Sequence, residues 1–244
     1  MPQPSILDTG FDVRTDAGGK DPDSHSATLR AYHWLLWSKP LPSGAMFDLD
    51  ERLHHSSGFG DFWLSSDAIT HTYSNRTSPA KLVAAMQQVP PGEVTAFYGL
   101  GCTVGAYTLF PVKVREGARW RLSINQARGL HPKIRDRFDL TLECIRRHYE
   151  GLPSPLANTL HWYVPFFDLF GGFHGYVDHF LLNDLVTDDS KAVAFLTDFD
   201  DFRKGPLPSG SATEYREYMR RSMAFIRARN ERIAHYATTL NPQD

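Results

Sequence analysis

The sequence predicts an α+β fold, in which a small antiparallel sheet packs against a mostly helical body with a long C-terminal helix. In the first half, the segment Phe62–Ser66 and a hairpin pattern from Tyr107–Val114 to Arg119–Asn125 indicate antiparallel strands. In the second half, apolar side chains over residues 211–240 recur alternately every four and every three positions. Ser211 and Glu214 give this segment a capping-box start, so we expect one long helix there.

Length and composition are those of one globular domain. The chain has 244 residues, of which 41% are hydrophobic and 13% aromatic, enough to bury a core. Residues 1–25 are rich in Asp, Gly, Pro and Ser and are expected to form an extended N-terminal arm. Residues 26–130 are expected to form a mixed α/β part, and residues 131–244 a mostly helical part.

Charge and cysteine content argue against several classes of protein. The formal net charge of −2 argues against a broad nucleic-acid-binding surface and leaves room for a local basic cleft. Cys102 and Cys144 both stand in apolar surroundings and predict no disulfide framework. The sequence shows no charged and then apolar leader and no long apolar run, so we expect a soluble, cytoplasmic protein with no membrane partner.

The N-terminal elements contain four residues of interest. Arg14 shares a face of a short extended segment with acidic neighbours, which fits either a docking arm that contacts substrate or a self-satisfied surface cluster. His33 lies on the apolar side of a helix over residues 26–38 and is expected to be a hydrogen-bonded core histidine. Lys39 is held by the rigid turn after that helix, where a phosphate contact is possible. Ser65 closes the strand Phe62–Ser66 and is either a turn residue or a substrate contact.

The middle of the chain contains a glycine-rich segment and a polar turn. Gly105 and two earlier glycines lack the spacing and the preceding strand of a dinucleotide-binding loop, so close helix packing is the better explanation. Asn125, Gln126 and Arg128 follow the predicted strand. Two amides and a guanidinium beside a helix N-terminus make a credible anion site, although they would equally serve to fix the loop.

A helix from Lys133 to Tyr149 is the centre of the functional argument. Arg137 lies within its apolar arc, and an arginine keeps its proton, so a buried one must meet an anion. Arg137 is therefore either half of an internal ion pair or a group at the floor of a cleft that binds phosphate or carboxylate. Asp139 and Glu143 are expected on the opposite, solvated face.

Two further helices are expected over residues 155–170 and 173–186. The second contains His174, Asp178 and His179, whose order matches no zinc motif, so we expect no metal site.

The C-terminal helix contains a second arginine in an apolar stripe. Position 229, where the repeat requires an apolar side chain, is Arg229, and Asn230 follows it. Arg137 and Arg229 together are the best indication in the sequence of one polar cleft.

Several stretches resemble an uncharacterised bacterial family, also seen in prophage-like settings, that is defined as a domain of unknown function. The most specific stretch is Asp136–Arg147, and the resemblance covers most of the chain. It implies a complete family member and brings no known reaction with it. The other matching stretches are Phe11–Asp16, Gly19–Asp23, Leu36–Pro42, Phe62–Asp67, Ile124–Gly129 and Gly175–Val186.

The leading hypothesis is an enzyme that acts on a nucleotide or a nucleic-acid-derived, phosphate-bearing substrate. Arg137 and Arg128, with Arg229 or Lys39, would hold the phosphate, and the many aromatic side chains would stack on a base. One version is an ADP-ribosyltransferase-like toxin or defence effector, which would use NAD and need a catalytic glutamate. Glu143 is the nearest such glutamate, although it lies on a helix and not on a strand; Asp139 and Arg137 complete the candidate catalytic set.

The alternative is a non-catalytic binding or regulatory protein of a phage-defence or toxin–antitoxin system, with a partner protein. In that case, Arg137 and Arg229 would be internal ion pairs with the chain's own carboxylates.

Overall fold

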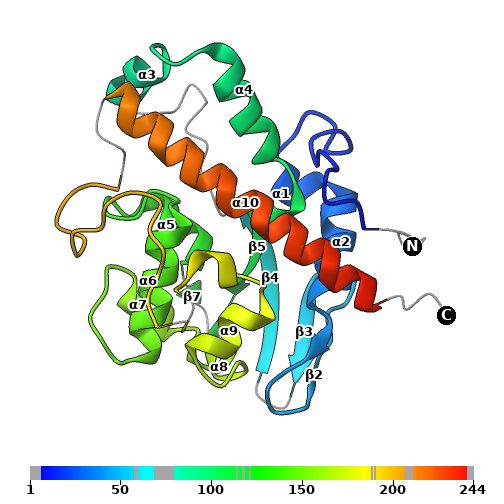
Figure 1. Ribbon diagram of the computed structural model, residues 1–244. Helices are drawn as coiled ribbons and strands as arrows, with labels where there is room; N and C mark the ends of the chain where they lie inside the picture. The colour runs from blue at the N-terminus through cyan, green and yellow to red at the C-terminus, as the bar shows by residue number, and fades with distance from the viewer. Residues whose placement is uncertain are drawn as a thin grey trace.

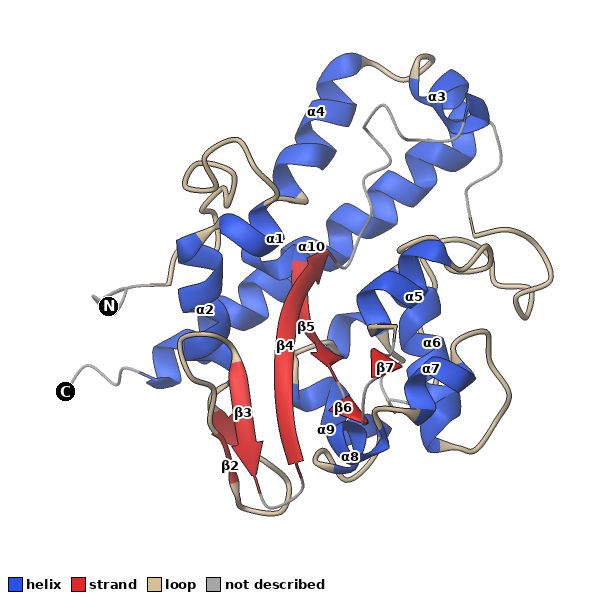
Figure 2. Cartoon of the chain, turned by 180° about the vertical axis from the view of Figure 1, so that it is seen from behind, coloured by secondary structure: helices blue, strands red, loops and turns tan. Residues whose placement is uncertain are grey.

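A computed structural model gives the structure of residues 7–57, 60–68, 80–113, 115–116, 119–120, 122–187, 189, 191–206 and 211–240. The fold is α+β with small antiparallel sheets and a long C-terminal helix, as the sequence predicts. Figures 1 and 2 show this helix, α10 (Ala212–Leu240), crossing the molecule diagonally. Among the described helices, none is long and apolar enough to cross a membrane.

The main sheet has three antiparallel strands in the order β3 (His54–Ser57), β4 (Gly60–Ala68) and β5 (Tyr107–Lys113). Cross-strand pairing runs from Trp63 opposite Lys113 to Ala68 opposite Tyr107, with an irregularity between Trp63 and Leu64. The end of β4 therefore lies beside the start of β5. Two smaller ladders join β1 (Lys39–Pro40) to β2 (Met46–Phe47) and β6 (Arg115–Glu116) to β7 (Arg119–Trp120).

The N-terminal arm is folded rather than extended over its described part. Turns lead from residue 8 to the short helix α1 (Pro22–His25), which Asp21 caps by accepting from the Asp23 amide. Ser26 then caps α2 (Ala27–Trp37) by accepting from the Leu29 amide. The arm folds because the Asp-Pro-Asp sequence supplies both a cap and a first-turn proline.

Helix α10 packs against α3 (Ala80–Met86), α4 (Pro91–Leu100) and the 3₁₀ turn η1 (Val104–Ala106). The prediction of close packing is confirmed at Gly105 in η1, whereas a methyl group on Gly99 would meet nothing within 4 Å. A methyl group built on Gly105 would lie 2.4 Å from Asn230 Oδ1 and 2.9 Å from the Ile226 carbonyl oxygen.

The segment 119–149 differs from the predicted strand and single helix. The strand β7 ends at Trp120, and α5 (Ile124–Leu130) follows, because Ser123 and Gln126 form a capping box that starts a helix. The next helix, α6 (Phe138–Tyr149), starts later than predicted. Arg135 and Asp136 have positive φ angles of 47° and 63°, which interrupt any helix from Lys133.

Two predicted helices are each divided in two. Residues 155–170 form α7 (Ala157–His161) and α8 (Val164–Asp168), since Pro165 can only occupy the first turn of a new helix. Residues 173–186 form α9 (Phe173–His179) and the 3₁₀ turn η2 (Asn183–Leu185), separated by Leu181 with a φ of 50°. Figure 2 shows α5 to α9 on one side of β4, and α1 and α2 on the other.

Candidate functional site

The end of strand β4 sends two neighbouring side chains to opposite faces of the sheet, as strand geometry requires. The Ser66 Oγ atom lies 2.9 Å from His33 Nε2 on α2. The Asp67 carboxylate points to the other side, where Arg128 Nη1 on α5 donates to its Oδ2 at 2.6 Å. We call the group of Asp23, Ser66, Asp67, Asn125 and Arg128 the strand-end site.

Arg128 is fully buried and connects three elements. Its Nε donates to Thr141 Oγ1 on α6 at 3.1 Å, and its Nη2 donates to the Asp136 carbonyl. The Asp136 carboxylate lies 3.7 Å from Nη1. The anion predicted beside Arg128 is thus supplied by the protein itself, through Asp67.

Asp23 on α1 brings a second carboxyl group to the strand-end site. Its Oδ1 atom is buried and has no hydrogen-bond partner in the described part of the chain. Burial, and then the nearby charges of Asp67 and Asp21, raise the pKa of Asp23 to about 8, while Arg128 and the Ser66 hydroxyl oppose part of that rise. Burial also raises the pKa of Asp67, and Arg128 opposes it. The charge of Arg128 therefore acts on two partly buried carboxyl groups, and Asp23 retains its proton at neutral pH.

A hydrogen-bond chain with a fixed direction reaches the strand-end site from α2. The Trp37 indole can only donate, and its Nε1 lies 2.9 Å from His33 Nδ1, so Nδ1 is the acceptor. His33 Nε2 therefore carries the hydrogen and donates to Ser66 Oγ. Burial lowers the pKa of His33 to about 3, with a smaller contribution from Arg229, so the ring stays neutral. His33 is a hydrogen-bonded core histidine, as the sequence analysis expects.

The other predicted residues of the polar turn differ in role. Asn125 Nδ2 donates to the Ser66 carbonyl at 3.1 Å, and its Oδ1 is buried without a partner among the described residues. Gln126 completes the capping box, with Oε1 3.3 Å from the Ser123 amide. Ser65 Oγ donates to the carbonyl of Ser66 at 3.2 Å. Asn125 thus belongs to the strand-end site, whereas Gln126 and Ser65 bond to nearby backbone.

The predicted catalytic set on α6 is buried and internally paired. Arg137 forms a bidentate pair with Asp139, and its Nη1 donates to Thr197 Oγ1 and to the Pro206 carbonyl, both at 2.6 Å. Asp139 also accepts from the Leu196 amide at 2.9 Å. These contacts attach α6 to the segment 195–206.

Asp139 and Glu143 are not on a solvated face, which corrects the prediction made from helix periodicity. Asp139 is covered by the segment 195–206, and Glu143 is buried beneath two arginines of its own helix. Arg146 and Arg147 lie 2.8 Å and 2.7 Å from the Glu143 carboxylate.

Arg229 is neutralised by carbonyl dipoles rather than by a carboxylate. Its guanidinium is fully buried and donates to the carbonyls of Gly105, Tyr107, Phe180 and Leu181 at 2.7–3.1 Å. Arg137 uses partners from different segments, so the two arginines do not form the single cleft that the sequence analysis predicts.

Asn230 and Arg14 also bind within the chain. Asn230 accepts from the Gly105 amide at 2.8 Å and donates to Thr103 Oγ1 at 2.9 Å, which fixes η1 against α10. Arg14 pairs with Asp12 through Nε and Nη2 at 2.9 and 2.5 Å and lies over the Tyr98 ring. Arg14 therefore belongs to a surface cluster in which it is neutralised by its own neighbour, Asp12, which was one of the two predicted alternatives.

Lys39 lines a groove of about 680 Å³ between β1 and α9. Its side chain contacts the rings of Trp37 and Tyr236. His174, Asp178 and His179 line the same groove, which we call the Lys39 groove.

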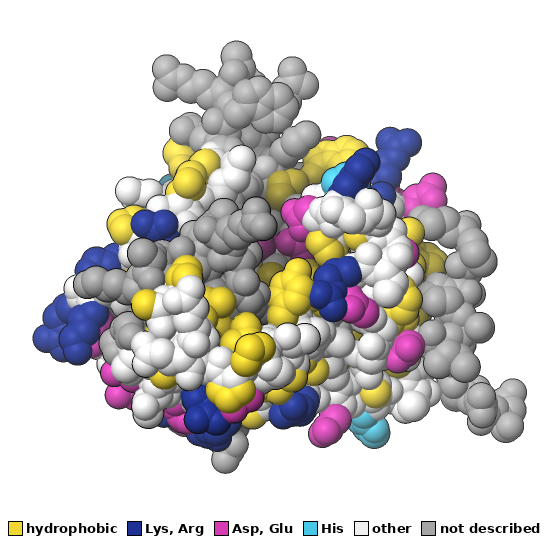
Figure 3. Space-filling view, turned by 90° about the horizontal axis from the view of Figure 1, so that it is seen from above, with side chains coloured by type: hydrophobic (Ala, Val, Ile, Leu, Met, Phe, Trp, Pro, Cys, Tyr) yellow, Lys and Arg dark blue, Asp and Glu magenta, His cyan; other side chains and the backbone are white. Residues whose placement is uncertain are grey.

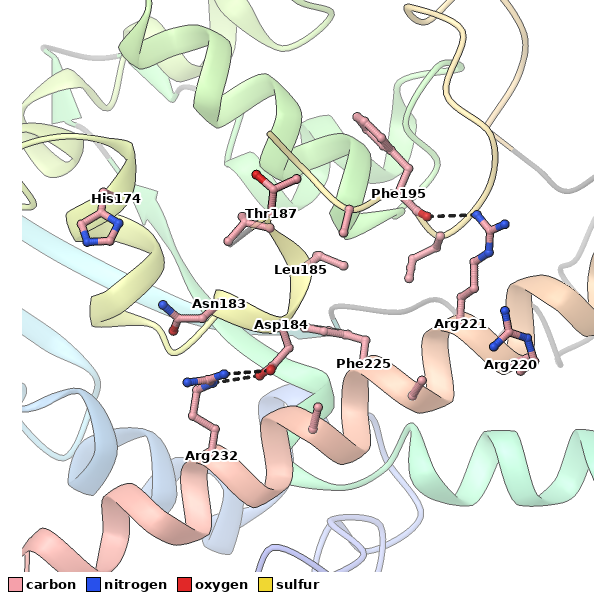
Figure 4. A pocket seen from close by; sticks show the side chains of 15 residues that line it. His174, Asn183, Asp184, Leu185, Thr187, Phe195, Arg220, Arg221, Phe225 and Arg232 are labelled. Carbon is pink, nitrogen blue, oxygen red and sulfur yellow. Dashed lines mark hydrogen bonds and ion pairs between the residues drawn. The ribbon is translucent and has the colours of Figure 1, made fainter. Parts of the chain in front are cut away.

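A second groove of about 750 Å³ runs along α10 (Figure 4). Its cations already have partners: Arg232 bonds Asp184 at 2.8–2.9 Å, and Arg220 and Arg221 both bond Glu217. Arg221 also donates to the Phe195 carbonyl at 3.4 Å. No cation that lines this groove lacks an internal partner within the described residues.

Charged side chains of both signs are interspersed on the face shown in Figure 3. In the described parts of the chain, no group of three or more His, Cys, Asp or Glu residues is arranged to hold a metal ion.

In a comparison with protein families, residues 7–233 match a family described as one of unknown function, DUF6994. The chain belongs to this family. The match confirms the resemblance to an uncharacterised domain. Neither the comparison with curated proteins nor that with solved structures finds a match.

Sequence reasoning missed Asp23, which it placed in an extended arm. The signal was the cap and proline around it, in a stretch that the resemblance already included. His179 was considered only as a metal ligand, and nothing in the sequence shows that its ring is buried.

Proposed function

We propose that the protein is an enzyme that acts on a nucleotide or a nucleic-acid-derived, phosphate-bearing substrate, by acid–base catalysis at the strand-end site. The observation that carries this proposal is the pair of partly buried carboxyl groups, Asp23 and Asp67: Asp67 is bonded to the buried cation Arg128, and Asp23, which feels the charges of both, has a raised pKa. A protonated carboxyl group and an ionised one near each other can supply an acid and a base together.

Cleavage of the bond between ribose and base is the reaction that suits this pair. Protonated Asp23 would donate its proton to the base nitrogen as the C1′–N bond breaks and its electron pair moves to that nitrogen. Asp67 would take a proton from the water whose oxygen bonds to C1′. The products are the free base and the ribose with a new hydroxyl group. Asn125 Oδ1, which is buried beside Ser66, is available to a substrate N–H or O–H.

In this proposal NAD would be a substrate rather than a cofactor. Its nicotinamide leaves as a neutral molecule, so its cleavage needs the Asp67 carboxylate and no proton from Asp23. The ADP-ribosyltransferase version that relies on Glu143 has less support, because Arg146 and Arg147 already bind that carboxylate.

The test is a turnover assay with AMP, other nucleotides, NAD and short RNA, in which chromatography detects the released bases. We expect Asp67→Asn to abolish release from every substrate and Asp23→Asn to abolish release from AMP while it spares NAD. Asp136→Asn, which changes a half-exposed carboxylate near the same arginine, is the matched control and should keep its activity. If the wild-type protein binds nucleotides but releases no base, the proposed catalytic activity is refuted.

A non-catalytic binding or regulatory role, such as that of a phage-defence or toxin–antitoxin component, is the second candidate. It is favoured by the internal partners of Arg137 and Arg229, because arginines that bond within the chain have a structural role. Under this alternative, thermal-shift measurements with nucleotides and NAD show no stabilisation. A nucleotide-dependent shift that Asp67→Asn removes would count against it.

A further inference from the structure

Lys39 is a buried cation for which the described residues supply no carboxylate and no hydrogen-bond acceptor. The residue is only 9% exposed. Its Nζ lies 4.6 Å from the centre of the Tyr236 ring and 5.4 Å from that of Trp37. Aromatic faces attract an ammonium group but accept no strong hydrogen bond from it. The three N–H groups of Lys39 thus have no acceptor within the described structure.

The charges around Lys39 leave an excess of positive charge. Arg229 lies against the same Trp37 ring, with its guanidinium carbon 5.6 Å from the ring centre. Its hydrogen-bond partners in the described part of the chain are carbonyl oxygens. The carboxylate that lines the groove, Asp178, is already engaged: it accepts from Asn183 Nδ2 at 2.6 Å and lies 2.9 Å from His174 Nε2. Burial, and then the nearby charge of Arg229, lower the pKa of Lys39 to about 8, so the amine is mostly protonated at neutral pH.

His179 also lines the groove and contains an unsatisfied acceptor. The residue is 4% exposed, and its Nε2 is buried with no partner among the described residues. The ring also forms a hydrogen bond with the Trp37 backbone, in which Nδ1–H is the donor. In the neutral ring Nε2 therefore has no hydrogen and presents a lone pair. Burial, and then Lys39, lower the pKa of His179 to about 3, so the ring stays neutral.

The shape of the groove depends on one close backbone approach. A methyl group on Gly175 would lie 2.0 Å from the Phe170 carbonyl oxygen and 3.2 Å from Pro42. The turn before α9 is therefore packed directly against the Pro40–Pro42 segment, and both form walls of the groove.

We propose that the Lys39 groove binds a small phosphate compound through two complementary contacts, in which Lys39 donates to a phosphate oxygen and His179 Nε2 accepts from the phosphate O–H. Inorganic phosphate satisfies both groups, because it keeps an O–H at neutral pH. Sulfate has no O–H and would leave the buried lone pair of His179 unsatisfied. The assignment is independent of catalysis at the strand-end site.

Titration of the whole protein at pH 7 tests the proposal, with inorganic phosphate, sulfate and sodium chloride compared at equal ionic strength. We expect phosphate to raise the melting temperature and to bind at least tenfold more tightly than sulfate. Lys39→Met should weaken phosphate binding at least tenfold. Lys191→Met, at a lysine whose side chain is 82% exposed, is the matched control and should bind phosphate like the wild type. His179→Phe should remove the preference for phosphate over sulfate.

Equal responses to phosphate and chloride in the wild type would overturn the proposal, as would unchanged phosphate binding in Lys39→Met. Equal affinity for sulfate would show a nonspecific anion site and would overturn it too. Loss of phosphate binding that leaves Asp67-dependent turnover intact separates this site from the proposed enzyme.

The wild-type protein offers a second measurement that needs no variant. Acetic anhydride labels neutral amines, and mass spectrometry reports each lysine separately. We expect phosphate to slow the labelling of Lys39 and not that of Lys191 or Lys204. Phosphate affinity should also fall above about pH 8, as Lys39 loses its proton next to Arg229, Asp178, His174 and His179. Labelling of Lys39 that phosphate does not change would contradict the assignment.

Discussion

At the scale of single residues, the distinctive feature of this protein is how its buried cations are neutralised. Arg137 has a carboxylate partner, Asp139, and the partners of Arg229 among the described residues are all carbonyl oxygens. Lys39 has neither within the described residues, and its ammonium group contacts aromatic rings instead. A buried charge with so little compensation is costly, and such costs are typical of groups that serve a ligand.

Removal of the Lys39 charge is therefore expected to stabilise the protein in the absence of ligand. Lys39→Met keeps most of the stem and removes the ammonium, and we expect it to raise the free energy of unfolding at pH 7 by about 2 kcal/mol. The pKa of Lys39 is about 8 in the folded protein, and that of an unfolded lysine is about 10.4. Below pH 8 both states hold the proton and the full cost of burial is present. Between these two values the folded state releases its proton first, so the wild type recovers stability.

Urea denaturation at pH 7 and pH 10 measures this effect. The advantage of Lys39→Met should be present at pH 7 and should shrink at pH 10, whereas Lys191→Met should match the wild type at both. If Lys39→Met is less stable than the wild type at pH 7, the positive charge of Lys39 is well stabilised by its surroundings and the prediction is wrong.

At the scale of elements, local signals decide where helices begin and end. The start of α5 follows from a capping box, and the division between α7 and α8 follows from Pro165. The late start of α6 could not be read from the sequence. Arg135 and Asp136 are not residue types whose presence predicts positive φ angles. The contact of Arg128 with the Asp136 carbonyl, which holds this turn, is a tertiary interaction that the sequence does not show.

The contact between η1 and α10 gives a sharp prediction at this scale. Gly105→Ala places a methyl group against the Ile226 backbone and the Asn230 side chain, which itself bonds the Gly105 amide. The helix cannot move without loss of the Arg229 contacts, so we expect the free energy of unfolding to fall by about 2–4 kcal/mol.

Gly99→Ala is the matched control, because a methyl group at Gly99 on α4 meets nothing within 4 Å. This substitution should be neutral or should stabilise the protein by up to about 1 kcal/mol through helix propensity. Thermal or urea denaturation distinguishes the two variants. Similar stabilities for both would mean that η1 does not constrain α10.

At the scale of the whole molecule, two neutral histidines lie within one continuous core. His33 and His179 both stay neutral because burial lowers their pKa to about 3. An unfolded histidine has a pKa of about 6.5, so the unfolded chain takes up protons that the folded chain rejects as the pH falls below that value. Each histidine thus destabilises the fold by about 1.4 kcal/mol per pH unit below pH 6.5.

Comparison with a variant isolates this contribution from that of the carboxyl groups. The wild type should lose stability relative to His179→Phe between pH 6.5 and pH 5, by about 2 kcal/mol. His235→Phe changes an exposed histidine on α10 and should follow the wild type. Urea denaturation at three pH values measures the difference. A difference that does not depend on pH would mean that His179 takes up a proton as readily in the folded protein as in the unfolded chain.

The sequence predicted the fold class, the long final helix and the close approach at Gly105. It also placed Asn125 and Arg128 together at one polar turn, and the structure adds the end of β4, to which both residues bond. It could not supply Asp23, which only tertiary packing brings to the end of β4. It could not supply the pairing of Arg137 with Asp139 either, because a helix from Lys133 would put these two side chains on opposite faces, whereas α6 starts only after Arg137.

Trp37 is placed where its fluorescence can report on anion binding. Its indole is fully buried, with Lys39 and Arg229 both within 6 Å of the ring centre. The emission energy of an indole depends on nearby charge, so an anion that enters beside Lys39 would change the colour or brightness of this fluorophore. The protein therefore contains an intrinsic optical reporter, and a spectrum recorded during a titration would show occupancy without any added dye.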